Sequence, residues 1–211
     1  IVSFDMGGTT AKICLIDGGE PHFERSFEVA RQYRFLKGSG IPIRIPVIEM
    51  VEIGAGGGSI ASVDPMRRIQ VGPASAGSEP GPACYGRGGV EPTVTDAQVV
   101  LGRLDPDMAL GGDLALDADL ARKAVETVAG PLGLSTIDAA LGIIRVINNN
   151  MALAIRSNSV ARGLDPRHRG AQGIGAEIGQ PRRHRGVPEP HHRADVAALV
   201  AEDPVGARLA H

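Results

Sequence analysis

A short run of acidic, glycine and hydroxyl residues near the start of the chain has the composition of a phosphate-binding turn. It reads Asp5-Met6-Gly7-Gly8-Thr9-Thr10. Glycines let backbone N–H groups approach phosphate oxygens, threonine hydroxyls add donors, and a carboxylate can hold a hydrated magnesium ion. The spacing therefore predicts phosphate binding by Gly7, Gly8, Thr9 and Thr10, with Asp5 as the metal-binding residue. An ordinary hairpin turn is the alternative, because glycine and threonine are common in turns.

A second glycine-rich segment, Gly54-Ala55-Gly56-Gly57-Gly58-Ser59, follows an extended run. We expect a loop that contacts a substrate or cradles an anion through its last four residues, Gly56, Gly57, Gly58 and Ser59. The alternative is that the glycines let this loop pack closely on another backbone. The segment does not complete Gly-x-Gly-x-x-Gly and residues 60–71 read as strands, which argues against a nicotinamide-binding fold. No Gly-x-x-x-x-Gly-Lys-Ser/Thr motif occurs, which excludes a P-loop enzyme.

Other polar residues are weaker candidates for chemistry. Asp96 and Glu91 lie near a predicted helix start, where a carboxylate is more often a cap than a catalyst. Arg87, among glycines, either meets an anionic substrate or phosphate or is solvated. Cys84 has no assigned base, which favours a small buried thiol over a nucleophile. The triplet Asn148-Asn149-Asn150 is compatible with a ligand contact or with a solvated face plus one buried amide.

The elements that must position these residues begin with strands. Residues 1–5 and 11–17 are β-rich and predict a hairpin with residues 6–10 at its tip. Residues 23–30 and 42–53 give further extended runs, and the prolines of the second run favour an edge or a strand start. Further on, the sequence predicts a hairpin of residues 59–63 and 67–71 around Asp64-Pro65-Met66, followed by an irregular stretch over residues 72–92.

Helices are predicted after residue 94. Thr95-Asp96-Ala97-Gln98 has the pattern of a capping box, and Leu120, Ala124 and Val128 line one face of a second helix. A long amphipathic helix is predicted from Ser135, a cap, to a stop at Gly163 and Pro166. Its apolar face consists of Ile137, Leu141, Ile144, Ile147, Met151 and Ile155.

Composition narrows the class of protein. A chain of 211 residues that is 43% hydrophobic and 22% charged can bury a core of one domain or somewhat more. The net charge of -2 gives no reason to expect a nucleic acid or an anionic membrane as a partner. Two cysteines suggest neither a disulfide framework nor a zinc site. With no long apolar run and no signal peptide, a cytoplasmic location is expected.

The last part of the chain differs from the rest. Residues 167–211 contain five of the six histidines and no lysine, methionine, phenylalanine or tyrosine. We therefore expect a core over residues 1–166 and an atypical Arg/His/Gly/Pro-rich tail over residues 167–211 that packs poorly. A shift of reading frame would produce the same contrast. Because Ile1-Val2-Ser3-Phe4 already reads as a buried strand, we also expect the sequence to begin inside a larger polypeptide.

Several motifs in a fixed order carry a family resemblance. Together they resemble the hydantoinase A/5-oxoprolinase family, which also includes subunits of acetone and acetophenone carboxylases. The matching motifs are Asp5-Met6-Gly7-Gly8-Thr9-Thr10, Gly54-Ala55-Gly56-Gly57-Gly58-Ser59-Ile60-Ala61, Gly77-Ser78-Glu79-Pro80-Gly81-Pro82-Ala83-Cys84-Tyr85-Gly86-Arg87-Gly88-Gly89, Glu91-Pro92-Thr93-Val94-Thr95-Asp96-Ala97, Leu101-Gly102-Arg103-Leu104 and Val160-Ala161-Arg162-Gly163-Leu164-Asp165-Pro166.

The resemblance implies an α/β fold of the actin-like ATPase (ribonuclease H-like) kind, with β-hairpins and glycine-rich loops followed by helices. In that fold two glycine-rich hairpins grip the phosphates, and the present hairpin would be the second. The first hairpin would lie upstream, and the adenosine-side loop expected after Pro166 is not in this sequence. We therefore expect the chain to be a fragment that is inactive and binds ATP poorly by itself. Ala11-Lys12 stands where the family often has Thr-Asp, which leaves the substrate open.

The resemblance also implies a reaction. ATP and Mg²⁺ would serve to phosphorylate the amide oxygen of a five-membered cyclic amide such as 5-oxoproline or hydantoin, which water then opens. A second, hydantoinase B-type subunit is the implied partner. One alternative is a subunit of an ATP-dependent acetone or acetophenone carboxylase. Another is a non-catalytic fragment that only binds a partner subunit.

Overall fold

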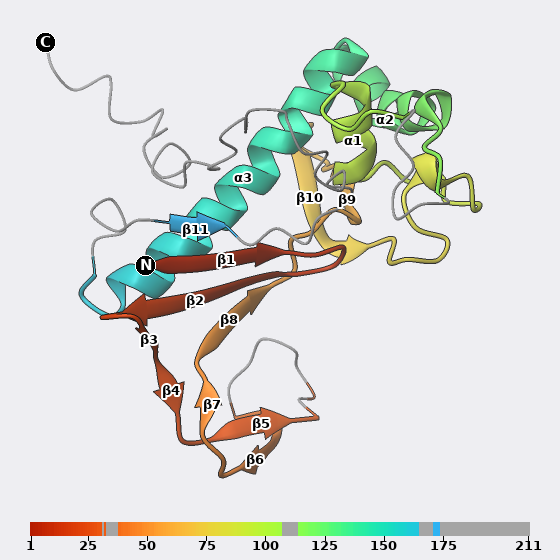
Figure 1. Ribbon diagram of the computed structural model, residues 1–211. Coiled ribbons are helices and arrows are strands. Elements are labelled where there is room, and N and C mark those ends of the chain that lie inside the picture. The colour runs from red at the N-terminus through yellow and green to blue at the C-terminus, as the bar shows by residue number, and fades with distance from the viewer. Residues whose placement is uncertain (31, 33–37, 107–113, 165–170, 174–211) are drawn as a thin grey trace, which may run out of the picture.

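The computed structural model describes residues 1–30, 32, 38–106, 114–164 and 171–173. Figure 1 shows a small sheet that contains both ends of the described chain, with the long helix α3 lying along it. Helices α1 and α2 gather at one end of α3, next to the hairpin of β9 and β10. A group of short strands projects from the other side of the sheet. The fold is therefore a mixed α/β arrangement, as the sequence predicts.

The predicted first hairpin is confirmed. Strands β1 (Val2–Met6) and β2 (Ala11–Asp17) pair antiparallel, with Met6 opposite Ala11 at the tip. Strand β8 (Met50–Ile53) pairs antiparallel with the other edge of β2. Apolar side chains alternate along β2, so that Ala11, Ile13 and Leu15 are buried. This alternation fixes the register, because a slip of one residue would expose all three.

Strand β11 (Ala171–Gly173) pairs parallel with β1, with Val2 opposite Ala171. These three residues belong to the segment that the sequence marks as a tail, and they join the central sheet. All other residues of the predicted tail lie outside the described part of the chain.

The predicted long helix is α3 (Thr136–Val160), and its cap is the predicted one, since the Ser135 side chain accepts a hydrogen bond from the N–H of Asp138. Its buried face runs through Ile143, Ile147, Met151 and Ile155 and contacts both main apolar clusters. The prediction that Ile137 belongs to this face is wrong, because its side chain is 50% exposed. Ile137 lies in the first turn of the helix, one residue after its start.

Helix α1 (Val94–Val100) begins earlier than predicted. The capping box on Thr95 and Gln98 is wrong: the cap is Thr93, whose side chain accepts from the N–H of Asp96, while the Asp96 carboxylate accepts from the N–H of Thr93. Helix α2 (Ala118–Leu132) is capped by Asp117 and ends at Gly133 in the left-handed conformation. Its buried face includes the predicted Ala124 and Val128.

The hairpin predicted around Asp64-Pro65-Met66 is confirmed as β9 (Ser59–Val63) and β10 (Ile69–Ser75), joined antiparallel. Strand β10 extends into the stretch that the sequence predicts to be irregular, and a short 3-10 turn, η1 (Ala83–Tyr85), follows. The guanidinium of Arg67 donates to the carbonyl oxygen of Pro131 at 2.8 Å, so the tip of this hairpin is tied to α2.

The extended runs predicted over residues 23–30 and 42–53 are both interrupted. They contain β4 (Phe23–Glu24), β5 (Phe27–Val29), β6 (Ile41–Ile43) and β7 (Val47–Ile48) in addition to β8, while β3 (Glu20–Pro21) extends the sheet beside β2. Proline breaks the second run, because it cannot donate to a ladder. Strands β4 and β7 form one two-stranded sheet, and β5 and β6 form another. Large apolar side chains in residues 23–50 are exposed: Phe23, Phe27, Ile41, Ile43, Ile45, Ile48 and Met50.

Among the described residues no single helix is long and apolar enough to cross a membrane; α2 and α3, which meet at 91°, meet the length and composition criteria only as a bent pair.

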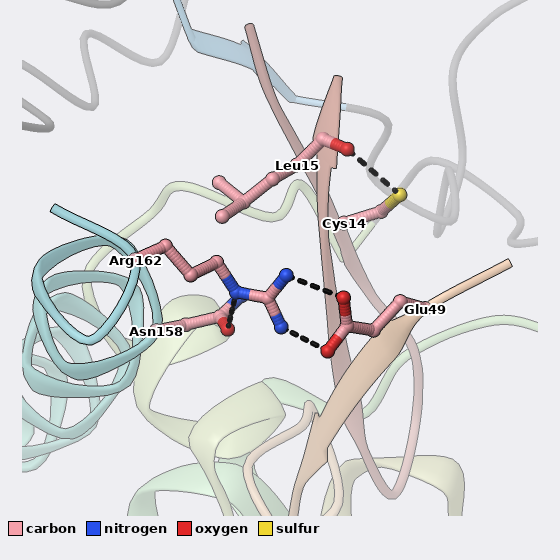
Figure 2. A network of polar contacts seen from close by, with 5 residues as sticks. All are labelled: Cys14, Leu15, Glu49, Asn158 and Arg162. Atoms are coloured by element: carbon pink, nitrogen blue, oxygen red, sulfur yellow. Dashed lines mark hydrogen bonds and ion pairs between the residues drawn. The ribbon is translucent and has the colours of Figure 1, made fainter. Parts of the chain in front are cut away.

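An ion pair ties the C-terminal end of α3 to the sheet. Figure 2 shows the Arg162 guanidinium donating through two nitrogens to the carboxylate of Glu49, and through Nε to the side-chain oxygen of Asn158. Both partners are mostly buried, and the hydrogen bonds with Glu49 raise the pKa of Arg162 above its usual value. Burial, followed by the charge of Glu49, raises the pKa of the nearby Cys14 thiol. The network therefore holds one charge pair in a partly desolvated position.

We predict that Glu49→Gln lowers the free energy of unfolding by about 2 kcal/mol, between the cost of an exposed and of a fully buried broken pair. Urea denaturation followed by circular dichroism measures this change. Glu91→Gln, at an exposed position, is the control and should leave the midpoint unchanged. Equal midpoints for the two variants would show that the pair does not stabilise the fold.

Candidate functional site

The turn between β1 and β2 exposes backbone donors. Residues 7–10 form it, and the N–H of Gly7 donates to the carbonyl oxygen of Thr10 at 2.8 Å. Gly8 and Thr9 are exposed, whereas Thr10 is buried. Within the described part of the chain, no acceptor pairs with the N–H of Gly8 or Thr9. Two neighbouring donors at an exposed tip are suited to an anion from solution.

The glycines of this turn are not required by packing within the described chain. A Cβ added to Gly8 would meet no atom within 4 Å, and one added to Gly7 would make only an ordinary contact, 3.5 Å from the Thr10 carbonyl oxygen. Neither residue has a positive φ. The absence of side chains therefore leaves open space beside the free donors, which is what close approach of a phosphate needs.

Asp5 lies on β1, two residues before the turn, and is partly buried. Strand alternation places it on the opposite face from Phe4 and Met6, which pack against the main apolar cluster. No group of three or more His, Cys, Asp or Glu side chains that could hold a metal occurs among the described residues. A single carboxylate fits magnesium, which is usually held by one or two carboxylates together with water and substrate phosphates.

The second glycine segment packs directly on this turn. The N–H of Gly57 donates to the carbonyl oxygen of Gly7 at 3.0 Å, and the N–H of Gly58 donates to that of Gly8 at 2.6 Å. A Cβ on Gly56 would lie 2.7 Å from backbone atoms of Gly7 and Gly8, so only glycine fits there. The segment 54–59, which we call the glycine loop, therefore supports the turn from behind.

The donors predicted for anion binding in the glycine loop are already used within the protein. Besides the two bonds to the turn, the N–H of Gly56 donates to the Ser59 hydroxyl at 2.9 Å, and the N–H of Ser59 donates to the Gly56 carbonyl oxygen at 3.1 Å. Ser59 is fully buried. These bonds correspond to the alternative interpretation, close packing of one backbone on another.

Helix α1 fixes the glycine loop in turn. The N–H and the hydroxyl of Thr95 both donate to the carbonyl oxygen of Gly57, at 2.8 and 2.9 Å. The N–H of Ala76 donates to the carbonyl oxygen of Gly58 at 2.9 Å. Thr95 was predicted only as a helix cap, and its position in the first turn of α1 gave no sign of this contact across 38 residues. The helix, the loop and the turn thus form one hydrogen-bonded series.

Asp96, a candidate catalyst in the sequence, is fully buried. Its carboxylate accepts hydrogen bonds from the N–H groups of Ala83, Cys84 and Thr93 and from the Thr93 hydroxyl, at 2.7 to 3.3 Å. With four donors around it, this carboxylate joins η1 to the start of α1 and is closed to a substrate. The structure therefore supports the capping role that the sequence left as the alternative.

The remaining candidates lie away from any assembled site. Arg87 and Glu91 are exposed, on the loop that precedes α1. Cys84 is fully buried. Burial raises the pKa of its thiol, and the Asp96 carboxylate raises it further, so the thiol stays protonated near neutral pH. Cys84 thus has the properties of a small buried side chain.

The glycine contacts give a prediction about stability. Gly56→Ala should lower the free energy of unfolding by about 1–3 kcal/mol, because the new methyl group meets the backbone of the turn. Gly8→Ala is the matched control, since its methyl group enters open space. Thermal and urea denaturation of both variants measure the difference. A Gly56→Ala protein as stable as Gly8→Ala would mean that the glycine loop is not in close contact with the turn.

Comparison with known proteins assigns the chain to a family. The profile of the hydantoinase/oxoprolinase family matches residues 1–175. The caprolactamase subunit alpha of Pseudomonas jessenii is 44% identical over 180 residues, which is 85% of this chain and 25% of that protein. The acetophenone carboxylase gamma subunit of Aromatoleum aromaticum is 43% identical over 169 residues, which is 79% of this chain and 22% of that protein. This chain thus spans about a quarter of the length of these curated relatives.

Solved structures give the same result for the fold. The ATP-dependent caprolactamase from Pseudomonas jessenii superposes with a TM-score of 0.70 and 43% identity, covering 83% of this chain and 24% of that chain. Nucleotide-free acetone carboxylase superposes with a TM-score of 0.68 and 32% identity, covering 81% of this chain and 23% of that chain. The α/β fold is that of an actin-like ATPase, and the chain belongs to the hydantoinase/oxoprolinase family.

Proposed function

We propose that this chain supplies the phosphate-binding turn of an ATP-dependent enzyme that opens a cyclic amide. The observation that supports this most directly is the exposed turn of residues 7–10. It presents unpaired N–H groups beside open space, and a second glycine loop supports it through backbone hydrogen bonds. The similarity of the chain to an ATP-dependent caprolactamase supports a nucleotide triphosphate as the ligand.

Activation is needed because amide resonance makes a cyclic amide a poor electrophile and water is a weak nucleophile. Magnesium-ATP, when bound, would supply a phosphoryl group for the amide oxygen and leave as ADP. Water could then add to the ring carbon, the C–N bond would break to give a free amine, and the phosphoryl group would leave as inorganic phosphate. Such phosphoryl transfer depends on positioning and charge neutralisation more than on covalent chemistry by the protein. A rigid turn with fixed donors provides both.

Each residue of the turn has a role in this proposal. The N–H groups of Gly8 and Thr9 donate to phosphate oxygens, and Gly7 allows the close approach. The exposed Thr9 hydroxyl adds a donor, and Asp5 holds the hydrated magnesium. Thr10, which is buried, supports the turn through its carbonyl oxygen, the acceptor of the Gly7 N–H. Gly57 and Gly58 act through the turn: their hydrogen bonds to the carbonyl groups of Gly7 and Gly8 hold its backbone in place.

A carboxylase subunit is the second candidate, because the acetophenone carboxylase gamma subunit is almost as similar in sequence as the caprolactamase subunit. The ATP step is the same, and the acceptor is bicarbonate or a ketone. Both relatives are named as subunits, which supports a second subunit as the partner of this chain. A hydantoinase B-type subunit is the partner that the family resemblance implies.

We predict that Asp5→Asn and Gly8→Ala each lower ATP hydrolysis by the enzyme containing this chain at least about a hundredfold, the size of effect typical of a lost electrostatic contact. Asp5→Asn should also weaken the dependence on magnesium. Isothermal titration of the assembled enzyme with magnesium-ATP measures binding directly. Wild-type turnover with normal magnesium dependence in both variants would remove the turn from the site. Absence of nucleotide binding at any stage of assembly would favour a non-catalytic, partner-binding role.

The choice between the two reactions is made by a substrate panel. Phosphate release should rise several-fold with 5-oxoproline, hydantoin or ε-caprolactam and stay at its basal rate with acetone or acetophenone plus bicarbonate. Ring opening, followed by the appearance of a free amine or carboxylate, should match phosphate release in amount. Stimulation by a ketone with bicarbonate alone would make this chain part of a carboxylase.

A further inference from the structure

Strands β4 to β7 form an arm that projects from the central sheet. The chain leaves the sheet after β3, runs outward through β4 and β5, and returns through β6 and β7 to β8 (Figure 1). The main contacts of β4 are with β7, and those of β5 are with β6. We call residues 23–29 and 41–48 the arm. Because an isolated two-stranded sheet is at best marginally stable in water, an arm of this kind is expected to pack on another surface.

One face of each small sheet is apolar and exposed. Phe23 is paired with Ile48, and Phe27 is paired with Ile43. Paired residues of antiparallel strands share a face, and all four of these side chains are exposed. Glu24, the neighbour of Phe23, alternates to the other face and is partly buried. A sheet that packs on its own core has the reverse pattern, so the apolar face of the arm is not covered by the described chain.

Exposed apolar side chains are concentrated in the arm. Among the described residues, 14 large hydrophobic side chains are exposed, and six of them lie in the 15 residues of the arm. Single exposed apolar residues are ordinary, whereas a cluster marks a surface that binds another molecule. The six residues are Phe23, Phe27, Ile41, Ile43, Ile45 and Ile48.

The charge that the arm presents to solvent is positive. Arg25 and Arg44 are exposed, whereas Glu24 and Glu28 are partly buried. The Glu28 carboxylate accepts a hydrogen bond from the N–H of Gly38 at 2.7 Å, so it is used within this part of the chain. Over residues 25–44 the sequence has five lysines or arginines and one glutamate, although the whole chain has a net charge of -2. Basic charge is thus gathered around the apolar face.

This combination favours a different protein over a second copy of the chain. A two-fold contact between copies places the same patch on both sides, so the arginines of one arm would approach those of the other. A surface bordered by carboxylates is complementary instead. Phenylalanine and arginine are also enriched in protein interfaces, where lysine is depleted.

The arm is held firmly where it leaves the sheet. The N–H of Glu49 donates to the carbonyl oxygen of His22 at 2.8 Å, and the Glu49 carboxylate binds Arg162 after α3. These contacts fix the start of the arm relative to the helices. A surface presented in a fixed orientation loses less conformational freedom when a partner binds.

We propose that the arm is the docking site for the second subunit of the enzyme. The apolar side chains of β4 to β7 pack on an apolar surface of that subunit, whose border carries carboxylates that pair with Arg25 and Arg44. This assignment rests on the proposed function, in which the chain works with a second subunit, and it names the surface that binds this partner. The arm leaves β2 at the end opposite the phosphate turn, so docking and nucleotide binding use separate surfaces.

The test measures association between the full-length polypeptide that contains this chain and its separately purified second subunit, by surface plasmon resonance. Phe23→Ser combined with Ile41→Ser should weaken association at least about tenfold, the loss typical of an interface hot spot. Met66→Ser combined with Leu153→Ser is the matched control and should change nothing. The arm residues are 63% and 64% exposed and the control residues 68% and 64%, so neither pair removes a core side chain.

A second pair of variants tests the charge. Arg25→Glu combined with Arg44→Glu should slow association at least about tenfold at low salt, because the charges would then repel a border of carboxylates. Arg103→Glu combined with Arg122→Glu, at exposed positions outside the arm, is the charge-matched control and should keep the wild-type rate.

Four results would overturn the docking site. They are wild-type association in both arm variants, protection of the arm from hydrogen exchange in the full-length polypeptide alone, loss of self-association in place of subunit association, and arm-dependent binding to anionic lipid vesicles in place of the subunit. The outcome is separable from that of the proposed reaction. Arm-dependent association in an enzyme without amide-stimulated phosphate release rejects the reaction and keeps the docking site. Amide-stimulated phosphate release by an assembly that both arm variants leave intact rejects the docking site and keeps the reaction.

Discussion

Two backbone hydrogen bonds between the glycine loop and the first turn determine how the candidate site is built. They use the N–H groups of Gly57 and Gly58 and the carbonyl groups of Gly7 and Gly8. They hold the backbone of the turn in place, while Gly8 and Thr9 remain exposed. The Thr95 hydroxyl of α1 donates to the carbonyl oxygen of Gly57 in the glycine loop. Helix α1 therefore helps to position the turn, in addition to strands β1 and β2.

Glycine serves two distinct physical purposes in this arrangement. Gly56 is required by the chain itself, since any side chain would meet the backbone of the turn. Gly8 has free space around it, so packing within the described chain does not require its lack of a side chain. In α3, Gly142 likewise allows close contact with β10, because an added Cβ would meet Ile69.

Buried polar groups hold the layers in register. The Asp96 carboxylate takes four hydrogen bonds from η1 and from the cap of α1, and the pair of Arg162 with Glu49 joins α3 to the sheet at the opposite end. Satisfied in this way, they specify geometry at little cost, whereas an unpaired buried charge would be strongly unfavourable. The apolar clusters then need only to fill the space between fixed elements.

The sequence by itself determined the local elements: the hairpin around residues 6–10, the β9–β10 hairpin, α3 with its Ser135 cap, and the family through the order of its motifs. These follow from periodicity and turn chemistry, which act between near neighbours. Tertiary structure alone decided that α1 starts at the Thr93 cap, that Ile137 lies outside the packed face, and that the donors of the glycine loop are used internally. Each of these depends on contacts between segments far apart in the chain, and no local pattern encodes which distant backbone will occupy a donor.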